Sequence, residues 1–245
     1  MPKLSSSQRA TTIPRARRSV AVPKPRITSV VDGGEATVID QRVVQGNNDI
    51  LIQKACSLWL KKEGPLVLDD PFVLDPTYGR GNFWTIYRPT NFITHDIELD
   101  GVDFRHLPEP DNTFDLVAFD PPYVSIGGVE TSKLPDFLDR YGMGMTKGHK
   151  ALFAMNIAGL AECARVTKKR GIIFMKCGDF VESGKFVQGH QIMVEAGMSL
   201  GLEQVDEIVH ASGTGPQPLK NRDGSPRKQV HSRRAHTFLV VWRKR

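Results

Sequence analysis

Apolar and polar positions follow two different spacings along the chain from about residue 48 onward. Apolar residues recur at helical spacing in three segments, so we expect helices over 48–64, 151–169 and 189–201. Compact apolar runs predict strands instead. The expected strands cover 71–75, 91–96, 102–107, 114–120, 172–178, 202–210 and 235–244.

The order of these elements indicates the fold class. Strands that alternate with helices are typical of an α/β protein with a parallel, doubly wound sheet. The last two expected strands, 202–210 and 235–244, have no helical pattern between them. We therefore expect these two to pair antiparallel at an edge of the sheet.

Charge is distributed unevenly along the 245 residues. The net charge is +6, but residues 1–30 hold seven Lys or Arg and no acid, and residues 220–245 hold nine with one acid. The body between them is therefore acidic. Basic segments at both ends fit a polyanionic partner such as nucleic acid, although such segments can also simply aid solubility.

Composition excludes several classes of protein. No apolar run approaches the roughly 20 residues of a membrane span, so we expect no membrane partner. Cys56, Cys163 and Cys177 are far apart and form no CxxC pair, which indicates neither a metal site nor a disulfide framework and fits a cytoplasmic protein. Residues 1–30 scatter prolines among Ser, Thr and Arg, so we expect a disordered basic arm followed by one domain over 31–245.

The first motif with chemical content is VLDPTYGRGNF at 73–83. A strand ends at Asp75, and a turn containing Gly79 and Gly81 follows. In open α/β sheets ligands bind at the carboxyl ends of the strands, and glycines let the backbone approach a ligand closely. The motif matches neither GxGxxG nor a P-loop, and the alternative is a tight structural turn.

Two acids follow at the ends of the next expected strands. Asp96 lies 21 positions after Asp75, a spacing typical of a carboxylate that binds ribose hydroxyls, and Glu98 is a competitor for that role. Asp103 with Phe104 could hold an adenine ring. The alternatives are an ordinary acid at a strand end and a loop acid beside a core phenylalanine.

The sharpest motif is AFDPPYV at 118–124. An apolar strand delivers Asp120 to the ligand edge of the sheet. Pro121 and Pro122 supply no N–H, so the carbonyls there stay free to accept hydrogen bonds. Tyr123 adds a flat face, and together these groups suit a planar group with an NH2 on its edge. A structural Pro-Pro turn is the alternative.

DPTYGRGNF followed after about forty positions by FDLVAFDPPYV resembles the S-adenosylmethionine-dependent amino-methyltransferases of DNA, whose signature is [D/N/S]-P-P-[Y/F/W]. The likeness is to small modification methylases of bacteria and bacteriophages, and it covers roughly 45–245. It implies a Rossmann-like class I methyltransferase fold, with a seven-stranded, mostly parallel sheet and an antiparallel last strand. It also implies S-adenosyl-L-methionine as the cofactor, bound at Asp75, Pro76, Tyr78, Gly79, Gly81, Asp96, Asp103 and Phe104.

The same resemblance implies the reaction and the catalytic residues, which are Asp120, Pro121, Pro122 and Tyr123. The enzyme would transfer a methyl group to the exocyclic amino group of a flipped base in DNA, adenine N6 first, as in restriction-modification systems. Three alternatives stay open. These are a DNA cytosine-N4 methyltransferase, an RNA guanine-N2 methyltransferase, and a non-catalytic nucleic-acid-binding protein on the same scaffold.

No recognition domain separates the two motifs, which departs from several classes of the family. Target recognition is then left to the segments 124–150 and 211–235. The second segment is basic and carries His231, with His236 just after it, so it is expected to contact phosphates, a solvated linker being the alternative. Its candidate nucleic-acid-binding residues are Lys220, Arg222, Arg227, Lys228, Arg233 and Arg234.

Overall fold

A computed structural model describes most of the expected domain. All described residues belong to one unit, Val38–Arg245. The expected basic arm over 1–30 lies outside the described residues. The described ranges are 42–60, 70–123, 148–211, 223–225, 231–232 and 234–245.

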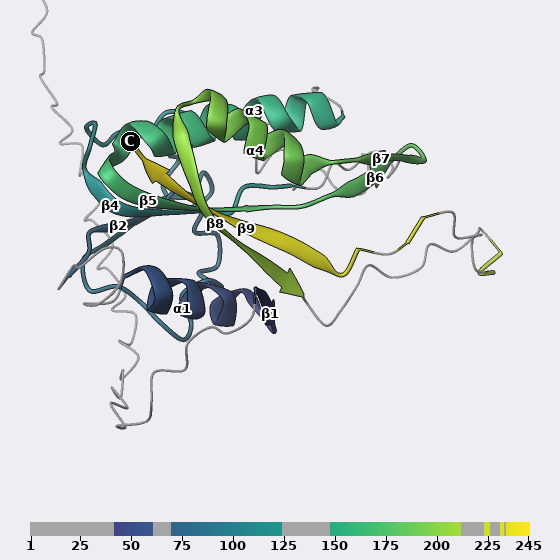
Figure 1. Ribbon diagram of the computed structural model, residues 1–245, viewed down its shortest axis with the longest axis horizontal. Coiled ribbons are helices and arrows are strands. Elements are labelled where there is room, and N and C mark those ends of the chain that lie inside the picture. The colour runs from purple at the N-terminus through teal and green to yellow at the C-terminus, as the bar shows by residue number, and fades with distance from the viewer. Residues whose placement is uncertain (1–41, 61–69, 124–147, 212–222, 226–230, 233) are drawn as a thin grey trace, which may run out of the picture. The chain divides into compact units, whose positions relative to one another are not determined.

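The described residues form a seven-stranded sheet that confirms the expected fold class (Figure 1). The strand order is β1-β8-β9-β5-β4-β2-β3. β9 runs antiparallel to β5 and β8, and every other pair is parallel. The strands are β1 Val43–Gln45, β2 Val73–Asp75, β3 Phe92–Thr94, β4 Phe114–Phe119, β5 Thr167–Cys177, β8 Leu202–Ala211 and β9 His236–Lys244.

Helices cover both faces of this sheet, as expected for a doubly wound fold. α1 (Asn48–Trp59) lies on one face, and α3 (His149–Val166) and α4 (Gly189–Ser199) lie on the other (Figure 1). Side chains alternate along β4 accordingly. Leu116 belongs to the apolar cluster of α1, whereas Val117 belongs to the cluster of α3 and α4.

Three details of the expected topology are wrong. Residues 102–107 form a turn and not a strand, because the Asp103 carboxylate accepts the backbone N–H of Arg105 at 2.9 Å and reverses the chain locally. The seventh strand is β1, which pairs with β8. β8 and β9 are therefore not the edge pair that the sequence predicted, since β1 lies outside them.

Smaller differences concern the segments around α3 and α4. α3 ends at Val166, and the residues after it begin β5, whereas the sequence pattern extended the helix to residue 169. β5 is irregular against β4 between its first pair, Phe114 with Thr167, and the regular ladder from Ile172 onward. A hairpin of β6 (Phe180–Glu182) and β7 (Lys185–Val187) was not predicted.

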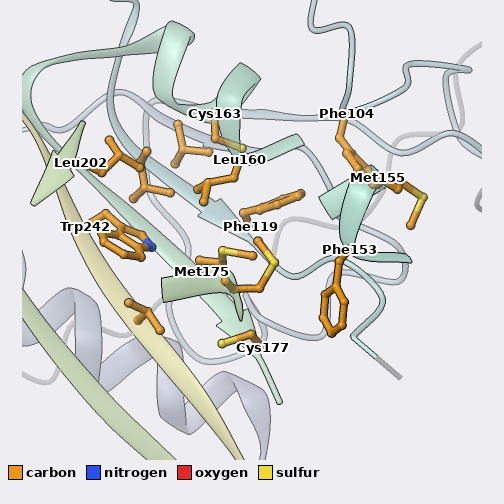
Figure 2. Close-up of a cluster of buried hydrophobic side chains, with 14 of the residues drawn as sticks. Phe104, Phe119, Phe153, Met155, Leu160, Cys163, Met175, Cys177, Leu202 and Trp242 are labelled. Atoms are coloured by element: carbon orange, nitrogen blue, oxygen red, sulfur yellow. The ribbon is translucent and has the colours of Figure 1, made fainter. Parts of the chain in front are cut away.

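The larger apolar cluster packs α3 and α4 on the sheet (Figure 2). Gly159 of α3 lies against two aromatic rings, and a Cβ atom added there would come within 2.6 Å of Phe104 and 2.7 Å of Phe119. The two rings lie 5.2 Å apart in an edge-to-face arrangement. A glycine at this position therefore lets the helix approach the sheet closely.

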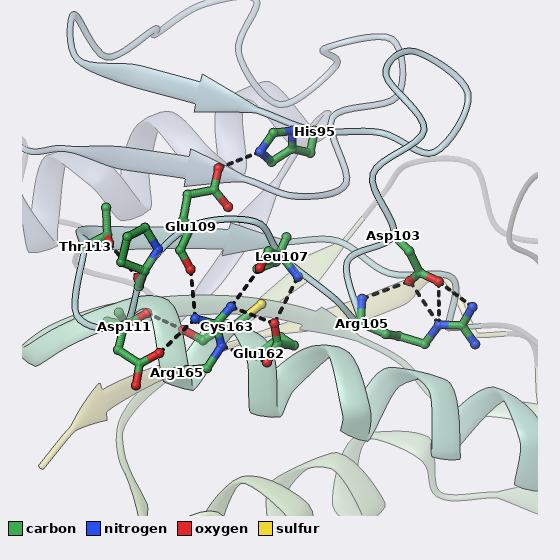
Figure 3. A network of polar contacts seen from close by, with 12 residues as sticks. His95, Asp103, Arg105, Leu107, Glu109, Asp111, Thr113, Glu162, Cys163 and Arg165 are labelled. Atoms are coloured by element: carbon green, nitrogen blue, oxygen red, sulfur yellow. Dashed lines mark hydrogen bonds and ion pairs between the residues drawn. The ribbon is translucent and has the colours of Figure 1, made fainter.

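An arginine at the end of α3 fixes the loop that leads into β4 (Figure 3). The Arg165 guanidinium donates to the carbonyls of Leu107 and Glu109, both at 2.8 Å, and bonds the carboxylates of Asp111 and Glu162. Glu162 also accepts the backbone N–H of Leu107 at 2.9 Å. Hydrogen bonds with Arg165 and Glu162 therefore hold the loop after Phe104 against α3.

We predict that Gly159→Ala lowers the free energy of unfolding although alanine favours helices. Overpacking typically costs about 1–3 kcal/mol, whereas the gain in helix propensity is at most about 1 kcal/mol. Denaturant unfolding measures the difference. Ala158→Ser on the exposed side of the same helix is the control, expected within about 0.5 kcal/mol of wild type. Unchanged or increased stability of Gly159→Ala would show that α3 has room to move.

Candidate active site

The candidate residues gather at one edge of the sheet. β2, β3, β4 and β5 are parallel, so their carboxyl ends meet at the same edge. Asp75 ends β2, Asp96 follows β3, Asp120 follows β4, and Lys176 is the penultimate residue of β5. Residues far apart in the sequence therefore share one site.

The turn after β2 is organised around a buried carboxylate. Asp75 is 2% exposed and accepts hydrogen bonds from the backbone N–H of Thr77 at 2.9 Å and from the Trp84 indole N–H at 2.7 Å. Burial raises the pKa of Asp75 to about 7, although these hydrogen bonds oppose the rise; the charge of Asp120 adds to it. The buried Asp75 carboxylate thus stabilises the turn through its bonds to Thr77 and Trp84.

Thr77 connects this turn to the loop after β4. Its hydroxyl lies 3.2 Å from an oxygen of Asp75, to which it donates, and it accepts the backbone N–H of Asp120 at 2.9 Å. One side chain therefore bonds both candidate motifs. The position of Asp120 is set by residues of the first motif as well as by its own strand.

The two glycines of the turn serve different purposes. Gly79 has a φ of +51°, and its N–H donates to an Asp96 oxygen at 2.9 Å. Gly81 has a φ of +72°, and a Cβ there would lie 2.6 Å from the Tyr78 hydroxyl oxygen. Tyr78 packs across the turn, and its own N–H bonds the His95 carbonyl at 3.0 Å.

A cavity opens between this turn and the loops that follow β3. Five of the eight expected cofactor residues line it, and Thr77 and Ile97 complete the lining. Asp75, Tyr78 and Gly81 do not line it and instead shape the turn. The five are Pro76, Gly79, Asp96, Asp103 and Phe104.

The two acids of the cavity differ in their partners. Asp96 accepts backbone N–H groups of Gly79 and Glu98, each at 2.9 Å, and a carboxylate has lone pairs left for further donors. Asp103 is paired with the Arg105 guanidinium (Figure 3). Burial alone would raise the pKa of Asp103, but its hydrogen bonds with Arg105 hold it below the ordinary value.

In the second motif, the Asp120 side chain is partly exposed but one of its oxygens is buried. The Asp120 side chain is 24% exposed, and its Oδ1 is buried with no hydrogen-bond partner among the described residues. Burial raises the pKa of Asp120, and the nearby Lys176 ammonium limits the rise. The carboxylate therefore has an unused acceptor.

The carbonyls of the two prolines are not equivalent. The sequence predicted that the carbonyls of this motif stay free. The Pro122 carbonyl instead accepts the Asn156 side-chain N–H at 2.8 Å, which anchors the loop to α3. No donor in the described part of the chain bonds the Pro121 carbonyl.

Three polar residues of this site were missed in the sequence. Thr77 lies inside the recognised turn, Asn156 inside an apolar helix, and Lys176 inside the apolar run of β5. Asn156 is 1% exposed and Lys176 is 3% exposed. A polar residue within an apolar run is the available signal, because buried amides and ammonium groups need partners.

The expected nucleic-acid contacts lie mostly outside the described residues, as do 124–147. Arg234 is described, and its guanidinium lies 4.3 Å from the ring centroid of Phe186 on β7. His231 bonds the Gly184 carbonyl at 2.9 Å. The remaining five, Lys220, Arg222, Arg227, Lys228 and Arg233, fall outside the described residues.

Within the described ranges, no group of three His, Cys, Asp or Glu side chains is arranged to hold a metal ion. No helix among them has the length and apolar character to cross a membrane.

Comparisons with known proteins give a likeness in fold only. No family model and no curated protein matches the chain. Among solved structures, a protein of Thermus thermophilus that is named as a candidate DNA modification methylase, solved with S-adenosyl-L-methionine, is 16% identical with a TM-score of 0.37. The match covers 58% of this chain and 53% of that protein, so the chain spans about half the length of this relative.

Two other solved structures of similar fold carry names with different activities. An S-adenosylmethionine-dependent methyltransferase of Methanosarcina mazei is 11% identical with a TM-score of 0.38, over 72% of this chain and 93% of that one. The [4+2]-cyclase SpnF is 15% identical with a TM-score of 0.45, over 80% of each chain. At such scores the likeness carries no argument about the reaction, which has to come from the site itself.

We predict that Asp75→Asn changes how stability depends on pH. The folded-state pKa of Asp75 is raised to about 7, so the stability linked to its proton is fully present below the unfolded-state value and is lost as pH rises through about 7. The variant lacks this loss, so its free energy of unfolding improves relative to wild type between about pH 4 and pH 7. Denaturant unfolding across this range measures the difference. Parallel curves for the two proteins would contradict the prediction.

Proposed function

We propose that the chain is an S-adenosylmethionine-dependent methyltransferase that acts on the exocyclic amino group of a base in DNA, with adenine N6 as the first choice. The observation that carries the proposal is an Asp120 oxygen that accepts no hydrogen bond from the described residues. It lies beside Pro121 and Tyr123 and is joined through Thr77 to the turn that lines the cavity. Such an enzyme fits restriction-modification and a cytoplasmic setting.

The cavity suits the cofactor by the chemistry of its lining. Apart from its two chain neighbours, the nearest atoms to a Cβ added at Gly79 would be 3.9 Å away, so the backbone there is open to a ligand. Asp96 has acceptor capacity for ribose hydroxyls, and Phe104 lines the same cavity, where we expect the adenine. Asp103 would take the adenine amino group while it stays paired with Arg105. When bound, S-adenosyl-L-methionine supplies an electrophilic methyl group on a sulfonium.

The residues of the second motif would activate the amino nitrogen. Its lone pair is delocalised into the base, so the nitrogen is a poor nucleophile. Hydrogen bonds from its two N–H groups to Asp120 and to the Pro121 carbonyl favour a tetrahedral nitrogen. Positive charge develops there during transfer, so these fixed acceptors stabilise the transition state more than the ground state. Tyr123 would stack on the flipped base.

The choice of target rests on fewer observations. An aspartate at the first position of the motif resembles adenine-N6 enzymes, while DNA cytosine-N4 and RNA guanine-N2 remain the alternative targets. The expected recognition segments fall largely outside the described residues. Transfer of a labelled methyl group to duplex DNA, single-stranded DNA and total RNA, followed by nucleoside analysis, decides among them. Binding without transfer on all three would favour the non-catalytic alternative.

We predict that Gly79→Val abolishes cofactor binding measured by calorimetry, because the side chain would fill the space that is open at this position. A steric cost of about 1–3 kcal/mol, typical of overpacking, would already weaken the affinity about 5- to 150-fold. Gly201→Val is the matched control, since Gly201 also has positive φ (+80°) and open surroundings but precedes β8 at the opposite edge of the sheet. Equal affinity in the folded Gly79→Val protein would move the cofactor elsewhere.

We predict that Asp120→Ala leaves cofactor affinity nearly intact while methyl transfer falls by about 10²–10³-fold or more, because a contact specific to the transition state is lost. Tyr123→Ala should instead weaken substrate binding by about 1–3 kcal/mol through lost stacking. Tyr123→Phe is its control and should keep much of the activity. Single-turnover rates and substrate titrations separate these effects, and transfer by Asp120→Ala at the wild-type rate would rule out this mechanism.

A further inference from the structure

A lysine is buried at the centre of the candidate site. Lys176 is 3% exposed, and its Nζ donates to the Asn48 side-chain oxygen at 2.7 Å. The same Nζ lies 3.8 Å from Oδ1 of Asp120 and 5.2 Å from the ring centroid of Tyr123. A cation in such a place needs partners, and two of these belong to the proposed catalytic motif.

The sheet brings Lys176 to this place. Met175 of β5 pairs with Phe119 of β4, so Lys176 and Asp120 are the next residues along the two strands. Ile172 and Phe174 face the cluster of α1, and the two-residue period of a strand puts Lys176 on that same face. Asn48 at the start of α1 lies there to receive the ammonium.

Several ionisable groups lie around Lys176. Beyond the effect of burial, the charge of Asp120 raises the pKa of the nearby Asp75 carboxyl. His210, which also senses Lys176, has its pKa lowered by burial first and by the lysine charge as well, and its ring bonds the Gly46 carbonyl. The Tyr123 pKa is raised by burial, so its phenol stays neutral at ordinary pH. The Lys176 charge therefore acts on Asp120, Tyr123 and His210 together.

The distance between the two charges has a chemical consequence. At 3.8 Å the ammonium attracts the carboxylate without a hydrogen bond, which requires a shorter contact. Among the described residues the Asp120 oxygen has no hydrogen-bond donor, so it can accept a substrate N–H. A direct hydrogen bond from the lysine would occupy that acceptor, whereas an apolar residue would leave the rise in the Asp120 pKa caused by burial unopposed.

We propose that Lys176 is a positioning residue for the proposed methyl transfer, which keeps Asp120 ionised at neutral pH while leaving its oxygen free for the substrate. The inference rests on the proposed function. A protonated aspartate would lose acceptor capacity and the negative charge that balances the developing positive nitrogen. The ammonium over the Tyr123 ring also helps to hold that ring in place.

The test compares wild type with Lys176→Met, which keeps the length without the charge, and with Lys176→Arg, which keeps the charge. Single-turnover methyl transfer is measured from pH 6 to pH 9. In Lys176→Met the rate should be about tenfold or more below wild type at pH 6.5 and should approach wild type near pH 9. Lys176→Arg should restore the wild-type profile. A uniform loss of rate at every pH would indicate a merely structural role and overturn the proposal.

A second variant keeps the test informative if Lys176→Met does not fold. Asn48→Asp retains the lysine but offers it a competing carboxylate, so the acid side of the rate profile should again move to higher pH. A profile that coincides with wild type would overturn the proposal.

Carbon-13 NMR titration of the Asp120 carboxyl separates this inference from the proposed function, because it needs no substrate. Asp120 should titrate at higher pH in Lys176→Met than in wild type. Wild type without methyl transfer on any nucleic acid, but with this titration shift, would sink the function and leave the role of Lys176 in ionising Asp120 standing. An active wild type with unshifted Asp120 titration in the variant would sink the inference alone.

Discussion

The hydroxyl of Thr77 is the contact on which the candidate site depends. It donates to the buried Asp75 carboxylate and accepts the backbone N–H of Asp120, so two loops that are about forty residues apart share one side chain. Backbone hydrogen bonds alone would let each loop move independently. Asp75 is itself buried and bonded by Trp84, so it holds the Thr77 side chain in place. Thr77 in turn fixes the position of the second motif relative to the first.

The fold class was predictable because its signals are local. Alternating strands and helices, and the missing helix before the last strand, required only the sequence between neighbouring elements. The errors concern long-range pairing. β1 has only three residues and forms a strand because it pairs with β8, more than 160 residues away. A local sequence pattern cannot predict such a distant partner. Residues 102–107 have the apolar alternation of a strand, but the Asp103 turn reverses them.

The site was predictable to a similar extent and for the same reason. Asp75, Asp96 and Asp120 each end a strand, and parallel strands end at one edge, so the sequence was sufficient to bring them together. What it could not show is which polar groups are already paired. That Arg105 holds Asp103, and that Lys176 approaches Asp120 from an apolar strand, depends on side chains meeting in three dimensions.

The place of β9 in the sheet has a consequence for folding during synthesis. β9 follows every other described strand in the sequence, yet it lies between β5 and β8 and carries fully buried residues such as Trp242. Until it leaves the ribosome, β8 and β1 have no neighbour through which to join the strands that carry the candidate site. The sheet is therefore completed only after translation has passed its last strand, and earlier chains expose two unpaired strand edges to aggregation and chaperones.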